Sequence, residues 1–297
     1  MKIEILEDAN AVALKAAAVI AAEAWAAVTA RGRFVLAVSG GHTPWHMLRA
    51  LAGEKIPWQK VHVMQVDERI AAAGHPDRNL THLRQSLLEH APLPAEQIYA
   101  MPVEDGDLEA AAANYASTLQ KFAGCPPALD LAHLGLGPDG HTASLVPGDP
   151  VPDVMDKDVA LTGTYQERRR MTLTYPILNR ALRILWLVTG AEKVEMLSRL
   201  LDADQTIPAG RINQEHALVL ADVAAAENLA REKGGEARTD RPTAEWKPIL
   251  TFEPQTEPCF GVIGWYSPSQ DHSRSTSIRT SEVLSGHCHH RNNARFS

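Results

Sequence analysis

Residues 34–52 of the chain read FVLAVSGGHTPWHMLRALA. The first five residues are a continuous apolar run, which is typical of a strand buried on both faces of a sheet. A helical pattern runs from Pro44 to Ala52, and residues 39–43 lie between the strand and this helix. This order predicts one half of a βαβ unit, with its two glycines at the carboxyl end of the strand, where ligands of such folds gather.

The same alternation of short apolar runs with longer helical patterns continues on both sides of this stretch. Strands are predicted at 3–6, 34–38, 61–66, 129–136, 170–174 and 184–188, and helices at 9–30, 44–52, 79–90, 108–122, 191–201 and 221–230. Strands and helices that alternate at these lengths favour βαβ units. We therefore predict an α/β fold of the doubly wound, Rossmann-like kind, with a mostly parallel sheet and helices on both faces in a single catalytic domain.

Composition and charge exclude several classes of protein. The 297 residues are 45% hydrophobic and 22% charged, as in ordinary globular proteins, which excludes disorder over most of the length. The net charge of −7 argues against a nucleic-acid partner held by a basic surface. The start MKIEILED is acidic where a signal peptide is apolar, and Lys15 and Glu23 interrupt the Ala-rich run at 9–30. We expect no membrane partner.

The last part of the chain differs from the rest. The alternating pattern stops near residue 232, and the remainder is rich in Ser, Arg, Thr and His. We expect a catalytic domain at 1–232 and a C-terminal extension at 233–297 that is flexible or weakly structured. Cys125 is the single cysteine in the first part, so no disulfide framework is expected there and a reducing, cytoplasmic setting is the simplest.

The first two strand ends carry residues suited to binding anions. Ser39, Gly40 and Gly41 allow a tight turn, and Thr43 can cap the next helix, whose free N–H groups attract a phosphate. The alternative is a plain turn with a good cap. After the strand at 61–66 comes Asp67-Glu68-Arg69, in which Arg69 can contact an anionic or carbonyl oxygen. The alternative here is a solvated loop.

The strand at 129–136 leads into the most informative segment, LGLGPDGHTASLVPG at 134–148. So many turn-forming residues at one strand end indicate a shaped site rather than an incidental loop. His141 is a natural general base for activating water, because histidine titrates near neutral pH. Asp139, two residues earlier, can hold the imidazole ring or the substrate.

Two further cations lie near predicted strand ends. Arg170 precedes a short apolar strand, and Lys193 lies in the first turn of a helix, where its charge opposes the helix dipole unless an anion binds there. Each alone is an ordinary surface charge. Together with the turn at 39–41 they form a plausible phosphate clamp.

Taken in order, these segments resemble the 6-phosphogluconolactonases, a group within the glucosamine-6-phosphate isomerase/6-phosphogluconolactonase family. The resemblance runs from the N-terminus to about residue 232. It is carried by SGGHTP at 39–44, VDER at 66–69, the glycine-rich segment at 134–148, RMTLT at 170–174 and TGAEK at 189–193. The glycine-rich segment is highly specific, whereas the others are weak singly but occur in the family's order.

The resemblance implies hydrolysis of 6-phospho-D-glucono-1,5-lactone to 6-phosphogluconate, in the oxidative pentose phosphate pathway and without cofactor or metal. His141 would be the general base, Asp139 would position water, substrate or imidazole, and Arg69 would stabilise the oxyanion. Substrate and phosphate binding would fall to Ser39, Gly40, Gly41, Thr43, Asp67, Arg170 and Lys193. The relative roles of Asp67 and Asp139 stay open. The implied partner is a small sugar phosphate lactone, and the implied assembly is a monomer or a weak homo-oligomer.

Two alternatives remain on the same scaffold. The related glucosamine-6-phosphate deaminases have Tyr after Asp-Glu, and an acidic residue with Asn and Phe after Gly-His, whereas this chain has Arg69 and the run TASLVP at 142–147. Both differences favour the lactonase. One departure from the lactonase pattern is Val146, where the family pattern has Phe. The other alternative is a non-catalytic sugar-phosphate sensor, but no basic DNA-binding pattern precedes the body of the chain.

Overall fold

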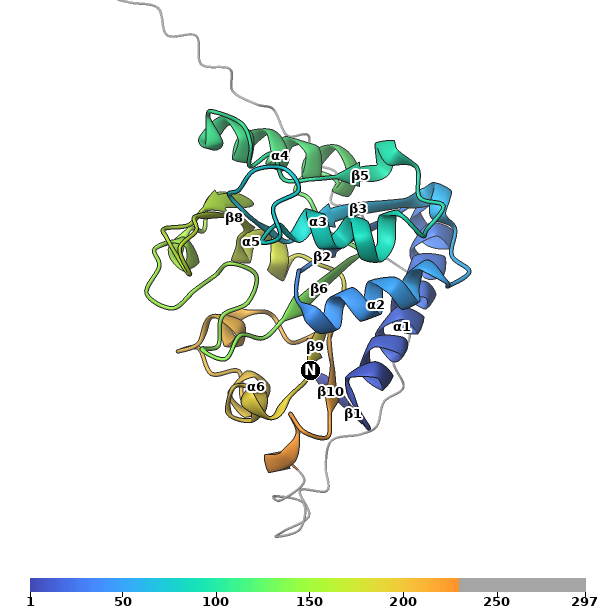
Figure 1. Cartoon of the computed structure of the whole chain (residues 1–297), viewed down its shortest axis with the longest axis vertical. Helices are drawn as coiled ribbons and strands as arrows, with labels where there is room; N and C mark the ends of the chain where they lie inside the picture. Colours follow the sequence, from blue (N-terminus) through green and yellow to red (C-terminus); the bar gives the residue numbers. More distant parts are fainter. Residues whose placement is uncertain (230–297) are drawn as a thin grey trace, which may run out of the picture. The chain divides into compact units, whose positions relative to one another are not determined.

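The computed structural model describes residues 1–229 (Figure 1), and these residues are built around a parallel sheet. Its seven strands follow the order β1-β10-β9-β6-β2-β3-β5, and every neighbouring pair is parallel. The strands are β1 (Lys2–Leu6), β2 (Phe34–Val38), β3 (Val61–Gln65), β5 (Ile98–Tyr99), β6 (Leu131–Gly135), β9 (Ile184–Val188) and β10 (Ala217–Asp222). The predicted α/β fold with a mostly parallel sheet is confirmed.

A second, antiparallel sheet of three strands lies beside the main one. It has the order β4 (Asp67–Arg69), β8 (Arg170–Leu173), β7 (Val159–Leu161). The predicted strand at 170–174 is therefore real, but it belongs to this small sheet. A hydrogen bond from the Leu173 N–H to the Val66 carbonyl joins it to the segment that leaves β3.

Six α-helices are found within the described residues, and they cover both faces of the main sheet. They are α1 (Ala9–Arg31), α2 (His42–Ala52), α3 (Asn79–Leu83), α4 (Leu108–Ala123), α5 (Tyr175–Asn179) and α6 (Val194–Leu201). Alternation along β2 separates the two cores, because Phe34 and Leu36 pack with α1 and α2, whereas Val35 and Ala37 pack with α4 and the small sheet. In Figure 1, α1 and α2 lie together on one face of the main sheet.

The long helix α1 is a buried element of this fold. It is the one described helix that is long and apolar enough, by length and composition, to cross a membrane. However, 61% of that apolar window is buried in the fold. Glu23 on its inner side forms an ion pair with Arg183, with Oε1 and Nε 3.2 Å apart. Asp8 caps its first turn through Ala11 N, and Gly32 ends it at a φ of 74°.

Three expectations need correction or lie beyond what the structure describes. The helix predicted at 221–230 is wrong at its start, because strand β10 continues to Asp222 and helical residues begin only at 227. The expected reducing, cytoplasmic setting stays a prediction. The boundary at 232 stays a prediction, and the extension at 233–297 lies outside the described residues.

Candidate active site

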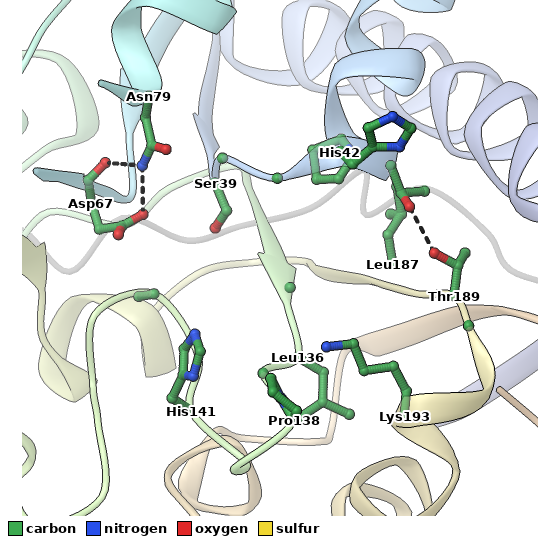
Figure 2. A pocket seen from close by; sticks show the side chains of 18 of the residues that line it. Ser39, His42, Asp67, Asn79, Leu136, Pro138, His141, Leu187, Thr189 and Lys193 are labelled. Carbon is green, nitrogen blue, oxygen red and sulfur yellow. Dashed lines mark hydrogen bonds between the residues drawn. The ribbon is translucent and has the colours of Figure 1, made fainter. Parts of the chain in front are cut away.

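A cavity of about 630 Å³ opens at the carboxyl ends of β2, β6 and β9 (Figure 2). The α/β rule that places ligands at this end of the strands therefore holds. Nine of the ten predicted site residues line the cavity, namely Ser39, Gly40, Gly41, Thr43, Asp67, Arg69, His141, Arg170 and Lys193. The tenth, Asp139, lies behind His141 and contacts its imidazole ring.

The turn after β2 is built on a buried histidine of the neighbouring strand. Ser39 donates its N–H to Nδ1 of His133 at 3.3 Å and its hydroxyl to the His133 carbonyl at 3.0 Å. Because Nδ1 accepts, the imidazole of His133 is neutral with its proton on Nε2. Burial lowers the pKa of His133 to about 3, in agreement with this neutral form. The turn is therefore fixed to the sheet before any ligand binds.

The turn then bends into α2, whose N-terminus faces the cavity. Gly41 occupies the N-cap position at a φ of 125°, a conformation that favours glycine. The sequence predicts that the side chain of Thr43 caps this helix, but in the structure it makes no capping hydrogen bond. Instead its hydroxyl lies 2.7 Å from that of Thr189, which follows β9. This hydrogen bond joins the turn after β2 to the turn that leads to Lys193.

Lys193 approaches the cavity from the end of β9. It ends a short 3₁₀ turn (Ala191–Lys193) and directly precedes α6. Its side chain is 17% exposed, its Nζ lies 4.0 Å from Glu192, and its ammonium group extends into the cavity (Figure 2). A mostly buried ammonium with one distant carboxylate is well placed to bind an anion.

His141 and Asp139 form a hydrogen-bonded dyad. Nδ1 of His141 lies 2.5 Å from Oδ1 of Asp139, which also accepts the His141 N–H at 3.1 Å. The other carboxylate oxygen accepts the Tyr165 hydroxyl at 3.1 Å. Burial acts to raise the pKa of Asp139, but the His141 charge and the hydrogen bonds from His141 and Tyr165 outweigh it and lower that pKa. Asp139 therefore stays ionised. Because it occupies Nδ1 of His141, Nε2 is the ring nitrogen that does not contact Asp139.

Glycines in this loop leave room for the dyad. A Cβ atom on Gly137 would lie 2.1 Å from Nδ1 of His141, and one on Gly140 would lie 2.7 Å from Ile207. Gly140 also has a φ of 82°. Gly137 is thus required by the imidazole of His141, and Gly140 by its backbone conformation and by Ile207.

Two arginines face each other across the small sheet. Arg69 and Arg170 are directly opposite in the antiparallel pairing of β4 with β8. Like charges at opposed positions repel unless an anion lies between them. The Nε atoms of both are buried and have no hydrogen-bond partner in the described part of the chain. The guanidinium of Arg170 also lies 4.9 Å above the ring of Tyr165. The guanidinium of Arg170 also donates to the side-chain oxygen of Gln166 at 3.1 Å, so its contacts within the described residues lie on the dyad side of the cavity.

Asp67 and Glu68 hold the opposite wall in place. Asp67 accepts the Ser144 hydroxyl at 2.6 Å and an N–H of the Asn79 side chain at 3.2 Å. Glu68 is fully buried, and its carboxylate accepts hydrogen bonds from the backbone N–H groups of Arg69, Asn79 and Leu80. The two acidic residues therefore order the loop, whereas Asp139 is the carboxylate that contacts the histidine.

Several residues of the site carry no role in the sequence reasoning. They are Glu68, Asn79, Ser144, Tyr165, Gln166 and Thr189. In the sequence Asn79 marked only the start of the helix predicted at 79–90, and it is the first residue of α3 and lines the cavity. Tyr165 lies in a loop without a recognisable pattern, so only the fold could bring it to Asp139. Within residues 1–229, no group of three or more His, Cys, Asp or Glu side chains could hold a metal ion.

The fold and site define an α/β protein in which a histidine–aspartate dyad and a glycine turn at the N-terminus of a helix line one cavity. Residues 7–221 match the family model described as glucosamine-6-phosphate isomerases/6-phosphogluconolactonase. The chain belongs to this family, which confirms the resemblance seen in its motifs.

The chain is similar to a curated relative and to two solved structures, as follows. A 6-phosphogluconolactonase from Synechocystis is 40% identical over 211 residues, which cover 68% of this chain and 88% of that protein. The crystal structure of a 6-phosphogluconolactonase from Thermotoga maritima matches with a TM-score of 0.67 at 26% identity, covering 74% of this chain and 98% of that one. These names support the expected class of carboxylic ester hydrolase. A monomeric glucosamine-6-phosphate deaminase also matches, with a TM-score of 0.65 at 19% identity, covering 76% and 99%, which shows the fold alone.

Proposed function

We propose that the chain hydrolyses 6-phospho-D-glucono-1,5-lactone to 6-phosphogluconate, with His141 as the general base. One observation carries this proposal: the dyad of His141 and Asp139 faces a cavity whose other walls hold the turn at 39–41 and the ammonium of Lys193. A lactone that carries a remote phosphate needs this combination. The names of the relatives support the substrate, and the geometry supports the roles.

The reaction then follows from the positions of the protons. Nε2 of His141 takes a proton from water, and the oxygen of that water attacks the lactone carbonyl carbon. Asp139 stabilises the imidazolium that results, through Nδ1. The tetrahedral intermediate collapses, the bond from the carbonyl carbon to the ring oxygen breaks, and the imidazolium returns its proton to that oxygen. The products are a hydroxyl group and a carboxylic acid, which ionises.

The remaining cations divide between the two ends of the substrate. The turn at 39–41, Thr43 and Lys193 bind the 6-phosphate, because the N-terminus of α2 and the ammonium converge there. Arg69 stabilises the oxyanion on the carbonyl oxygen. Arg170, beside Arg69 and over Tyr165, acts at the carbonyl end rather than in the phosphate clamp. Anchoring the phosphate converts its binding energy into orientation of the carbonyl.

The setting of the enzyme completes the proposal. We infer a cytoplasmic enzyme of the pentose phosphate pathway, without metal or organic cofactor, that works as a monomer or a weak homo-oligomer. The mostly buried α1 and the mild negative charge support this setting, since neither suits a membrane or a nucleic-acid partner.

Substitution of the base tests the proposal. We expect His141→Ala to lower kcat on the lactone by about 10²–10⁴-fold, which is the usual contribution of a general base, while 6-phosphogluconate still binds. His90→Ala is the matched control, because His90 is exposed and does not line the cavity. Full activity of His141→Ala would refute the assignment. Release of ammonia from glucosamine 6-phosphate by the wild-type protein would favour the deaminase instead.

A further inference from the structure

The side chain of Asn79 lies at the meeting point of three walls of the cavity. Its Oδ1 accepts a hydrogen bond from Nη1 of Arg69 at 2.9 Å. Its Nδ2 donates to the carbonyl of Asp67 at 2.9 Å and to the carboxylate of Asp67 at 3.2 Å (Figure 2). Only 6% of the residue is exposed, so water competes little for these hydrogen bonds.

The chemistry of the partners fixes which way this amide faces. A guanidinium can only donate hydrogen bonds, whereas a carbonyl and a carboxylate can only accept them. The oxygen of Asn79 must therefore face Arg69, and its nitrogen must face Asp67. Of the common side chains of this size, only an amide meets both demands at once. An aspartate at position 79 would set two carboxylates against each other.

The third wall is the turn after β2, and Gly40 of this turn packs closely against the side chain of Asn79. A Cβ atom on Gly40 would lie 1.9 Å from Oδ1 and 2.5 Å from Cγ of Asn79. The backbone of Gly40 does not have a positive φ, whereas Gly41 has a φ of 125°. Position 40 therefore excludes a side chain because of Asn79, and position 41 because of its backbone.

We propose that Asn79 is a positioning residue that holds the guanidinium of Arg69 at a fixed position relative to the phosphate-binding turn at 39–41. Its amide contacts both the guanidinium that faces the carbonyl and the glycine whose backbone faces the phosphate. It therefore sets the spacing between the two ends of the bound substrate. This inference rests on the proposed lactonase function, and it adds a residue to which the motifs assign no role.

A double-mutant cycle tests the steric part of the proposal. Asn79→Ala removes the atoms that a Cβ at position 40 would meet. We expect Gly40→Ala alone to lower kcat/KM at least tenfold and to lower the thermal midpoint. In the Asn79→Ala background the same substitution should cost less than twofold. Gly41→Ala is the control, and its loss should be equal in both backgrounds because its backbone strain does not depend on Asn79.

The positioning part is read from kinetics and pH. We expect Asn79→Ala to lower kcat about tenfold or more while KM changes less than threefold, because Arg69 loses its fixed direction. Asn79→Asp keeps the oxygen for Arg69 but adds a charge beside Asp67. Its activity relative to wild type should rise as pH falls from 8 to 5, because protonation of the added carboxyl restores a donor.

The possible outcomes separate this inference from the function on which it rests. Losses that add in the Gly40 and Asn79 cycle, or an Asn79→Ala variant with unchanged kcat, overturn the role of Asn79 while the wild type remains a lactonase. An inactive wild-type protein overturns the proposed function as well. Non-additive losses, together with the pH-dependent recovery of Asn79→Asp, establish the role.

Discussion

Replacing Asp139 by Asn is the most informative single change in this site. One carboxylate oxygen serves Nδ1 and the backbone N–H of His141, and the other serves the Tyr165 hydroxyl. An amide offers only one acceptor atom. If its oxygen stays with His141, its NH₂ group opposes the Tyr165 hydroxyl. If it turns round, it donates to Nδ1 and moves the ring proton to Nε2, where the base must be free.

The size of the effect follows from these contacts. Loss of one hydrogen bond to a charged group costs about 1.5–3 kcal/mol, or roughly 10–150-fold in rate. The wrong tautomer would extend the loss to about 10⁴-fold, the size of the effect in serine proteases. We therefore expect Asp139→Asn to lower kcat between about 10-fold and 10⁴-fold. KM should change less than threefold, because the phosphate walls are untouched.

The assay can use the proton that the reaction releases, followed with a pH indicator after subtraction of spontaneous hydrolysis. Asp153→Asn is a suitable control, since this exposed carboxylate pairs only loosely with Arg211, at 3.6 Å. The lowered pKa of Asp139 implies that it remains ionised on the acid side of neutrality. The wild-type pH profile should therefore show no loss of activity from protonation of Asp139 just on the acid side of neutrality. If Asp139→Asn keeps kcat within twofold, the dyad is not the catalytic unit.

Two further predictions concern Lys193, which lines the cavity, and His133, which lies beneath the turn after β2. Lys193→Met should raise KM about 10–150-fold with little change in kcat, because a charge-assisted contact to the phosphate is lost; a change confined to kcat would place Lys193 at the carbonyl instead. His133 is neutral in the folded protein, with a pKa lowered to about 3 from an ordinary value of 6.5, so the unfolded chain binds more protons in this range. The free energy of unfolding should therefore fall with acidification, by up to about 1.4 kcal/mol per pH unit. Urea titrations at pH 7 and 5 should show a loss about 2 kcal/mol smaller in His133→Gln than in the wild type, and equal losses would contradict this account.

The elements that the sequence predicted well are those whose signals are local. The structure of two segments can be predicted from the segments alone, because burial and backbone freedom act within a few residues; these are the apolar run at 34–38 and the glycine-rich turn at 134–148. The order of the motifs along the chain then brought nine predicted residues to one cavity. Local pattern alone was enough to single out the turn at 39–41, His141 and Asp139.

The remainder depended on pairing over long distances. The segment at 170–174 has the same apolar character as a strand of the main sheet, and only its antiparallel pairing with β4 shows that Arg170 faces Arg69. Asn79 at the start of α3 and Tyr165 on a loop form hydrogen bonds with residues 10 to 26 positions away in the chain. Such contacts depend on how the loops fold over the sheet, which periodicity does not encode.

The small antiparallel sheet gives the family room to diverge. The turn at 39–41 and Lys193 follow strands of the main sheet, whereas Arg69 and Arg170 lie on β4 and β8 of the separate one. Under the proposed function the residues around the lactone carbonyl are divided, because His141 follows β6 of the main sheet whereas the two arginines belong to the small sheet, which can vary while the main sheet is kept. A scaffold divided in this way suits a family whose description spans both isomerases and lactonases.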